Sequence, residues 1–362
     1  MKKFFVSVLI IIMALSLCLS FTGCKSHPES ITIYVPDGGP ALGMAYLMKD
    51  YPEIEGVKVE YRIVSDTAQL TAAQQIAAAV SNGDADVAVM PTNLAAKLYN
   101  AGKEIVLVGT NSNGLLYLVS DVQGDFSLDA LKGEVVYMVG QGGTPEAVFR
   151  KVLAANDIEF VEAEVENDVP VAVPGKVALF YSTGPVIFSG LADGSVHHAV
   201  LGEPAVSTAL AKGAAHNVSI VADLQALWQD ATDADTAGYP QTALVVKKSL
   251  LEADEDLVKK IAELTVDGGV ALSVDATDYV KYLREDMQST SVPQTLKQAG
   301  VVRANIDPRF GQAAKEQIES YLTVLKNFDA TLIGGKLPDD GFYFDDKGDL
   351  EAYRIAAKNL GK

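Results

Sequence analysis

The amino-acid sequence predicts an α/β protein built from two similar units, and three observations support this prediction. Short apolar runs alternate with helix-like segments along most of the chain, which is typical of α/β proteins. The chain has 362 residues, of which 49% are apolar, so it can bury two substantial cores. Residues 81–90 also resemble residues 192–201: each run is a helix end at glycine, a polar link and a buried strand. This separation is too long for a solenoid repeat and favours two lobes.

In the first unit, β-branched residues and period-two alternation predict strands, whereas runs rich in Ala, Leu and Gln predict helices. Turn residues at 36–40 and 81–83 separate these elements. Thr92 or Asn93 is expected to cap the third helix. The expected strands are 31–35, 57–64, 87–90 and 105–120, the last interrupted at 111–114, and the expected helices are 41–48, 70–80 and 92–99.

The second unit repeats this alternation. Pro145 is expected in the first turn of a helix, where its missing N–H costs nothing. Tyr239-Pro240-Gln241 precedes a further strand, and the chain beyond Leu250 is mostly amphipathic helix. The expected strands are 135–139, 198–201 and 242–247, and the expected helices include 146–155, a helix that ends near 210, and 312–325.

The N-terminus predicts export. Lys2 and Lys3 precede an apolar run at 4–19, and small residues follow, so residues 1–23 are expected to be a signal peptide. The run is too short for a membrane span. Cys24 after Thr22-Gly23 resembles the lipobox of bacterial lipoproteins. That resemblance implies acylation of the Cys24 sulfur, for example with palmitate, and cleavage before it. Residues 24–30 would then be a flexible lipid-anchored linker. A simple secretory signal with an incidental cysteine is the alternative.

Composition limits the partners. The net charge of −18 argues against nucleic acid, because phosphate binding needs clustered Lys and Arg. It also argues against wide adhesion to an anionic membrane, so membrane contact is expected through the lipid alone. After cleavage Cys24 is the only cysteine left, so no disulfide can form within one chain. We expect an extracytoplasmic, lipid-anchored monomer, which is periplasmic if the cell has an outer membrane.

Four loops are candidates for a ligand site. In open α/β sheets ligands bind beyond the carboxyl ends of strands, next to helix N-termini. Glycines there allow close backbone approach, and neutral side chains add donors and acceptors. Two loops belong to each unit, so a cleft between the units would be lined from both sides. The candidate residues in these loops are Asp37, Gly38, Gly39, Thr92, Asn93, Gln141, Gly142, Gly143, Thr144 and Glu203.

The order of several short motifs resembles the nitrate/sulfonate/taurine class of solute-binding proteins of ABC importers. The resemblance covers essentially the whole mature chain. It rests on residues 82–89, 128–133, 201–204, 238–242 and 333–339, together with Phe342-Tyr343. It implies a two-lobe periplasmic-binding-protein-like (type II) fold with a ligand cleft between the lobes. The chain would cross between lobes near Ser120-Asp121 and near Tyr239-Pro240. Lobe I is then 31–120, lobe II is 121–238, and 239–362 returns to lobe I. A small-molecule solute and a membrane permease with its ATPase are the implied partners.

The class of solute is left open by the loops. None of the four contains Lys or Arg, whereas Asp37 and Glu203 are carboxylates. If either faces the cleft, a cationic, amine-bearing or hydrogen-bonding heterocyclic solute is favoured over an anion, as for relatives that bind thiamine pyrimidine precursors. The alternative for Glu203 is a structural carboxylate at a helix N-terminus, and for Asp37 a solvated turn residue.

Further candidates are weaker. Tyr239 lies at a predicted crossing beside the cleft and could stack on a planar solute. Asn111 and Asn113 lie near the first crossing, where hinge geometry is the alternative. Ser182 could contact the solute or cap the helix that follows.

Catalysis and cofactors are not expected. The adjacent His197 and His198 point to opposite faces of a strand, and no metal-binding or nucleophile motif occurs. The loop 141–144 lacks the lysine of a phosphate-binding loop. Two alternatives to import are kept: a receptor lipoprotein that presents its ligand to a sensor, and an enzyme on the same fold.

Overall fold

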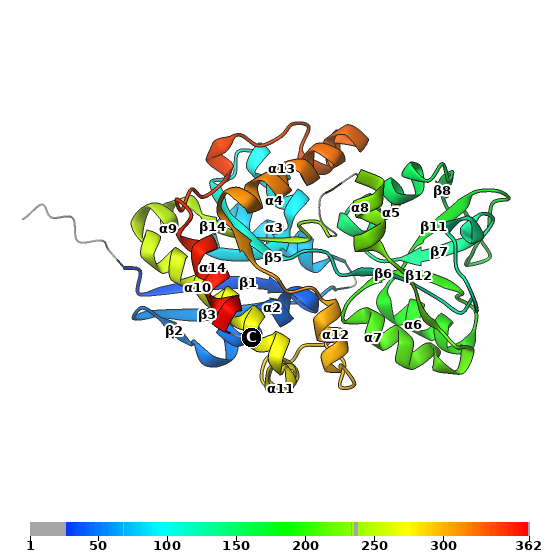
Figure 1. Cartoon of the computed structure of the whole chain (residues 1–362), viewed down its shortest axis with the longest axis horizontal. Coiled ribbons are helices and arrows are strands. Elements are labelled where there is room, and N and C mark those ends of the chain that lie inside the picture. Colours follow the sequence, from blue (N-terminus) through cyan, green and yellow to red (C-terminus); the bar gives the residue numbers. More distant parts are fainter. Residues whose placement is uncertain (1–26, 68, 233, 235–237, 361–362) are drawn as a thin grey trace, which may run out of the picture.

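The computed structural model describes residues 27–67, 69–232, 234 and 238–360. The predicted signal peptide and Cys24 lie outside the described residues. Figure 1 shows two lobes, each a sheet flanked by helices, joined by strands that run between them. The α/β fold class predicted from the sequence is confirmed.

The first lobe contains a seven-stranded sheet. Its strands, in spatial order, are β15 (Arg309–Phe310), β5 (Ile105–Ser112), β14 (Thr242–Lys247), β4 (Val87–Pro91), β1 (Ser30–Pro36), β3 (Val57–Val64) and β2 (Glu53–Ile54). Strands β3, β1 and β4 are parallel, and β14 pairs antiparallel with both β4 and β5.

Helices cover both faces of this sheet with separate apolar clusters. One cluster joins the sheet to α2 (Gly39–Asp50), α10 (Glu255–Val274), α11 (Thr277–Glu285) and α12 (Gln298–Arg303). The other joins it to α3 (Ala72–Asn82), α4 (Thr92–Asn100) and α13 (Gly311–Phe328). The remaining helices of this lobe are α9 (Lys248–Ala253), α14 (Asp349–Leu360) and the short η3 (Ala330–Ile333) and η4 (Asp340–Phe342).

The second lobe contains a six-stranded sheet and a small hairpin. The sheet order is β13 (Ser219–Asp223), β6 (Leu116–Ser120), β12 (His198–Gly202), β7 (Val135–Met138), β11 (Val177–Tyr181) and β8 (Phe160–Glu162); the hairpin is β9 (Val165–Glu166) with β10 (Val169–Pro170). Its helices are α5 (Thr144–Ala155), α6 (Gly184–Asp193), α7 (Ala205–Lys212), α8 (Leu224–Thr232) and the short η1 (Leu128–Leu131) and η2 (Gly213–His216).

The two sheets share a topology. Strand β4 lies between parallel β1 and antiparallel β14, and β12 lies between parallel β7 and antiparallel β6. The internal sequence similarity between residues 81–90 and 192–201 coincides with the equivalent strands β4 and β12. Helices α3 and α6 both end at a glycine with positive φ, Gly83 (83°) and Gly194 (79°), just before β4 and β12. The left-handed conformation suits glycine because it has no Cβ.

Two local expectations were wrong. The stretch 105–120 is two strands in different sheets, so the chain leaves the first sheet after Ser112 and not near Ser120. The polar interruption at 111–114 covers the end of β5 and the start of the crossing. Buried strands on both sides hide the change of sheet from a hydropathy pattern. Thr92 and Asn93 do not cap α4; both are helical, and Pro91 occupies the N-cap position.

Candidate functional site

The four predicted loops occupy equivalent places in the two lobes. The loop 36–40 follows β1 and 140–144 follows the equivalent β7, while 91–93 follows β4 and 202–204 follows the equivalent β12. Helices α2, α4, α5 and α7 begin in or directly after these loops. Backbone N–H groups at the carboxyl ends of both sheets are therefore available to polar groups.

Asn93 and Thr144 connect the two lobes directly. Thr144, the first residue of α5, donates its hydroxyl to Asn93 Oδ1 in α4 over 3.2 Å. Tyr321 of α13 donates to Thr144 Oγ1 over 3.4 Å, and Asn93 Nδ2 donates to the Leu332 carbonyl. Asn93 and Thr144 are 4% and 1% exposed. This buried hydrogen bond joins the two lobes, so any separation of the lobes would break it.

The other two loops also meet. A Cβ added at Gly39 would lie 3.0 Å from the Glu203 carbonyl oxygen and 2.9 Å from Leu115 Cδ2. A Cβ at Gly202 would lie 2.2 Å from Leu115 Cδ1. Leu115, in the first crossing, thus packs against glycines of both lobes, and a larger residue at either glycine would require the Leu115 side chain to move. The start of α2 and the end of β12 therefore meet at the first crossing.

Asp37 is a structural carboxylate. It accepts six hydrogen bonds, from Gly38 N, Ser65 Oγ, Ser289 Oγ, Thr290 N, Thr290 Oγ1 and Ser291 N. Burial opposes its ionisation, but these hydrogen bonds, led by that from Ser289, outweigh burial and hold the pKa of Asp37 below its ordinary value of 3.8. Its oxygens anchor the segment 289–291, so Asp37 does not offer a free charge to a cationic solute.

Glu203 is buried, 2% exposed, and paired across the lobes. Its Oε1 lies 2.7 Å from Arg303 Nε and 2.6 Å from Arg303 Nη2, at the end of α12. Oε2 accepts from Ser207 N in the first turn of α7. Both roles match the structural alternative that the sequence left open, because the carboxylate is neutralised by Arg303 and by the helix N-terminus.

Asn111 lies at the end of β5, Asn113 in the first crossing and Gln241 in the second crossing. Asn113 Nδ2 donates to the Asp307 carbonyl, and Asn113 N donates to the Asn305 carbonyl. Asn111 packs closely against α2: a Cβ added at Gly43 of that helix would lie only 2.1 Å from Asn111 Oδ1. The backbones of Thr92 and Gln241, and of Gln241 and Ser112, are hydrogen-bonded to each other. The start of α4, the end of β5 and the two crossings therefore form one polar edge of the first lobe.

Within the described part of the chain, the remaining candidate residues of the second lobe do not contact the first lobe through hydrogen bonds. Gln141 is exposed and donates to Glu162, and Gly142 is exposed and donates its N–H to Glu146. Gly143 is half-buried and precedes α5 as its N-cap residue. Ser182 is half-buried, and its N–H bonds the Met138 carbonyl. These four residues are not brought against the first lobe by any described hydrogen bond.

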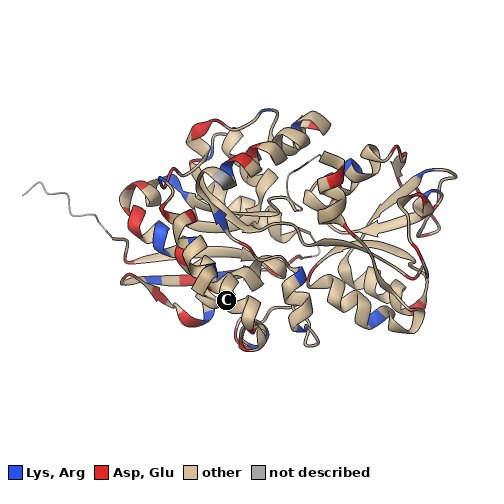
Figure 2. Cartoon of the chain, viewed as in Figure 1, with Lys and Arg blue, Asp and Glu red and all other residues tan. Residues whose placement is uncertain are grey.

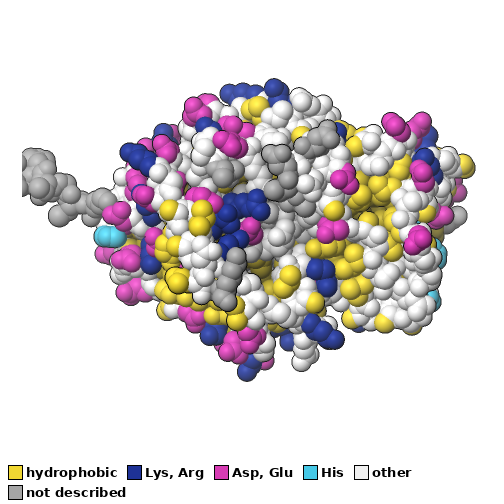
Figure 3. All heavy atoms as spheres, viewed as in Figure 1, with side chains coloured by type: hydrophobic (Ala, Val, Ile, Leu, Met, Phe, Trp, Pro, Cys, Tyr) yellow, Lys and Arg dark blue, Asp and Glu magenta, His cyan; other side chains and the backbone are white. Residues whose placement is uncertain are grey.

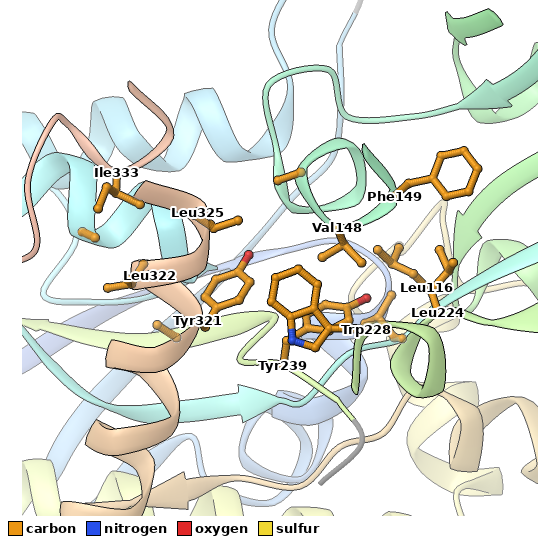
Figure 4. Packing of buried hydrophobic residues seen from close by; sticks show 14 of the residues in the cluster. Leu116, Val148, Phe149, Leu224, Trp228, Tyr239, Tyr321, Leu322, Leu325 and Ile333 are labelled. Atoms are coloured by element: carbon orange, nitrogen blue, oxygen red, sulfur yellow. The ribbon is translucent and has the colours of Figure 1, made fainter. Parts of the chain in front are cut away.

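Tyr239 is fully buried in an aromatic cluster between the lobes (Figure 4). Its ring lies 5.4 Å from that of Trp228 in α8 and 6.1 Å from that of Tyr321 in α13, in a stacked arrangement with Tyr321. Its hydroxyl donates to Gln225. Burial raises the pKa of Tyr239 well above its ordinary value, so the hydroxyl stays neutral. Tyr239 packs the second crossing and has no exposed ring face for a solute in this conformation.

Four residues contribute to the interface without having been predicted from the sequence. They are Gln225, which accepts from Tyr239 of the second crossing, and Gln241, Arg303 and Tyr321. Gln241 lies within the motif that marked the second crossing, so its position was recognised but not its role. The other three lie on helices, and the sequence of those helices does not show that one face contacts a crossing or the other lobe.

Charged groups are interspersed over the surface. Figure 2 shows acidic and basic residues scattered over the outer helices, and Figure 3 shows both signs mixed on the visible face. Within the described part of the chain, no group of His, Cys, Asp and Glu is placed to hold a metal ion. Over the same residues, no helix is both long and apolar enough for a membrane span.

The architecture matches solved structures. A crystal structure of an ABC transporter from Parabacteroides distasonis is 27% identical, with a TM-score of 0.69 over 88% of this chain and 100% of that chain. The fold is that of the two-lobe periplasmic binding proteins. The periplasmic aliphatic sulphonate binding protein of Escherichia coli is 15% identical, with a TM-score of 0.62 over 88% of this chain and 93% of that chain.

A sulfonate-binding protein from Methylobacillus flagellatus, 13% identical, has a TM-score of 0.61 over 92% of this chain and 95% of that chain. At these two identities the likeness shows the fold and not the ligand. No protein-family model and no curated protein sequence matches the chain.

Proposed function

We propose that this protein is the extracytoplasmic solute-binding component of an ABC importer and that it performs no chemistry on its solute. The observation that carries the proposal is the hydrogen bond between Asn93 and Thr144, which joins the loop after β4 of the first lobe to the loop after β7 of the second lobe. The lobes are linked by two crossings, so they can separate around a hinge and close again on a small molecule. The similarity to the Parabacteroides distasonis ABC transporter supports the same function.

The proposed cycle uses differential affinity. The solute enters between the separated lobes and forms hydrogen bonds with the polar edge of the first lobe and with the start of α5. Closure is favoured only by the additional binding free energy of the closed form. The closed protein, a monomer tethered through a lipid on Cys24, then docks on a membrane permease whose ATPase drives release. The tether raises the local concentration near that permease.

The test combines binding and uptake. Small-angle scattering of the purified protein should show a smaller radius of gyration when a solute raises its thermal midpoint, since binding to the native state stabilises it. Deletion of the gene should abolish uptake of that solute, and a copy with Cys24→Ala should restore it poorly. Unchanged uptake after deletion would contradict import and favour a receptor for a sensor; turnover of the bound solute would favour an enzyme.

A further inference from the structure

Unpaired polar atoms gather at the polar edge of the first lobe. Nine buried side-chain atoms in the described part of the chain lack a hydrogen-bond partner. Five of them lie at the end of β5, at the crossings and at the start of α4: Thr92 Oγ1, Asn111 Oδ1, Asn111 Nδ2, Asn113 Oδ1 and Gln241 Oε1. Their residues are between 0% and 8% exposed. Because an unpaired buried polar group is costly, such a gathering indicates groups reserved for a ligand.

The unpaired atoms are mainly acceptors. The orientation of Asn113 is fixed, because its Nδ2 donates to the Asp307 carbonyl and leaves Oδ1 as the free acceptor. Asn111 offers an acceptor and a donor together, whichever way its amide is turned. An oxyanion brings only acceptors and would leave these carbonyl oxygens unpaired. A solute with N–H groups would satisfy them.

The helix N-termini that could bind an anion already hold carboxylates of the protein. Glu146 accepts from Gly142 N at the start of α5 over 2.6 Å and pairs with Arg150. Glu203 accepts from Ser207 N in α7, and Asp37 accepts from Gly38 N before α2. An added oxyanion at α2, α5 or α7 would have to compete with a carboxylate that already accepts from the N–H groups there. Helix α4, in contrast, has neither a side-chain cap nor an acidic residue in its first turn.

We propose that the solute is an uncharged molecule with both N–H donors and carbonyl or ring-nitrogen acceptors, such as an amide or a nitrogen heterocycle, and not a sulfonate or another oxyanion. A solute oxygen would lie near the start of α4, and its N–H groups would donate to Asn111, Asn113 and Gln241. A cation is disfavoured because the Asp37 oxygens are occupied by hydrogen bonds within the protein and Glu203 is paired with Arg303. This inference rests on the proposed function and specifies its solute.

The experiment compares two probe sets by thermal unfolding of the purified protein. The uncharged set is uracil, cytosine, nicotinamide and acetamide; the oxyanion set is ethanesulfonate, nitrate and sulfate. A rise in midpoint with a member of the uncharged set and none with the oxyanions is expected. A rise with an oxyanion alone would overturn this inference and leave the proposed function intact. No rise with any probe would count against both.

Variants test whether the unpaired atoms bind the solute. Thr92→Val keeps the side-chain shape and should raise the solute-free midpoint while weakening binding about tenfold. Thr265→Val is the matched control, because the buried Thr265 hydroxyl already donates to the Ala262 carbonyl and its removal should not raise the midpoint. Gln241→Met, a second variant of similar shape, should also weaken binding about tenfold. Wild-type affinity in both Thr92→Val and Gln241→Met would overturn the assignment of this edge.

Discussion

The Glu203 carboxylate of the second lobe and the Arg303 guanidinium of the first lobe form an ion pair, with Oε1 2.6 Å from Nη2. The Glu203 side chain is 0% exposed and that of Arg303 is 28% exposed. Tyr117 of β6 donates its hydroxyl to the Arg303 carbonyl as well. The lobes are therefore held together beside the first crossing by a partly buried charge pair and not by the crossing strands alone.

Removal of Arg303 should loosen the lobes. In Arg303→Met the buried Glu203 loses its counter-charge, and we expect the free energy of unfolding to fall by about 2–3 kcal/mol, less than for a fully buried pair because Arg303 is partly exposed. Urea denaturation measures this loss. Lys326→Met on the exposed side of α13 is the control and should change stability by about 0.5 kcal/mol or less. Equal stability of Arg303→Met and the control would show that the pair is not stabilising.

Acid should weaken the anchoring of residues 289–291 by Asp37. Because the pKa of Asp37 is lower in the folded chain than its ordinary value, its contribution is present above an unfolded pKa of about 3.9 and is lost as pH falls through the folded value. Asp37→Asn should cost about 2 kcal/mol at neutral pH and flatten the decline in stability below about pH 4. Unfolding free energies from pH 7 to pH 2 test this. Asp230→Asn, at an exposed position, should keep the wild-type slope.

Loss of the contact between Asn93 and Thr144 should reduce affinity more than stability. Thr144→Val removes the hydroxyl and Asn93→Ala removes its acceptor, each at a cost of about 1 kcal/mol in binding, or fivefold to tenfold in Kd. Calorimetric titration with the stabilising solute provides the measurement. Thr323→Val, whose hydroxyl bonds within its own helix α13, is the control and should bind normally. Unchanged affinity in both interface variants would remove Asn93 and Thr144 from the site.

Trp228 should report lobe movement. It is the only tryptophan of the chain, is 3% exposed, and packs against Tyr239 and Tyr321, so it contacts elements of both lobes. Separation of the lobes should admit water to its indole ring and shift its emission to longer wavelength. We expect the solute to shift emission to shorter wavelength and to reduce quenching by acrylamide. An emission spectrum that is the same with and without bound solute would show that this contact persists through the cycle.

The fold was largely predictable because its strands carry local signals. Residues 81–90 and 192–201 are similar because each run contains a helix end at a left-handed glycine, followed by a central strand of its sheet. The first crossing was misplaced because β5 and β6 are both fully buried, and their sequence does not show that they belong to different sheets.

The candidate site was predictable in its loops but not in its partners. Local turn and helix-start patterns located Gly39, Asn93 and Thr144, which the fold brings to the interface. Arg303 could not be foreseen, because its pairing with Glu203 joins residues one hundred positions apart. Whether a carboxylate faces a solute or an arginine depends on such distant contacts, so the loop composition alone left the roles of Asp37 and Glu203 open.

The position of β14 between β4 and β5 has a consequence for the order of synthesis. Both neighbours are translated long before β14 (Thr242–Lys247). The whole second sheet lies between β5 and β14 in the sequence. The first sheet therefore cannot close until about two thirds of the chain has been made, whereas the second sheet needs only a continuous segment. The second lobe can therefore complete its sheet first. Until β14 has been synthesised, β4 and β5 of the first lobe have no strand between them to pair with.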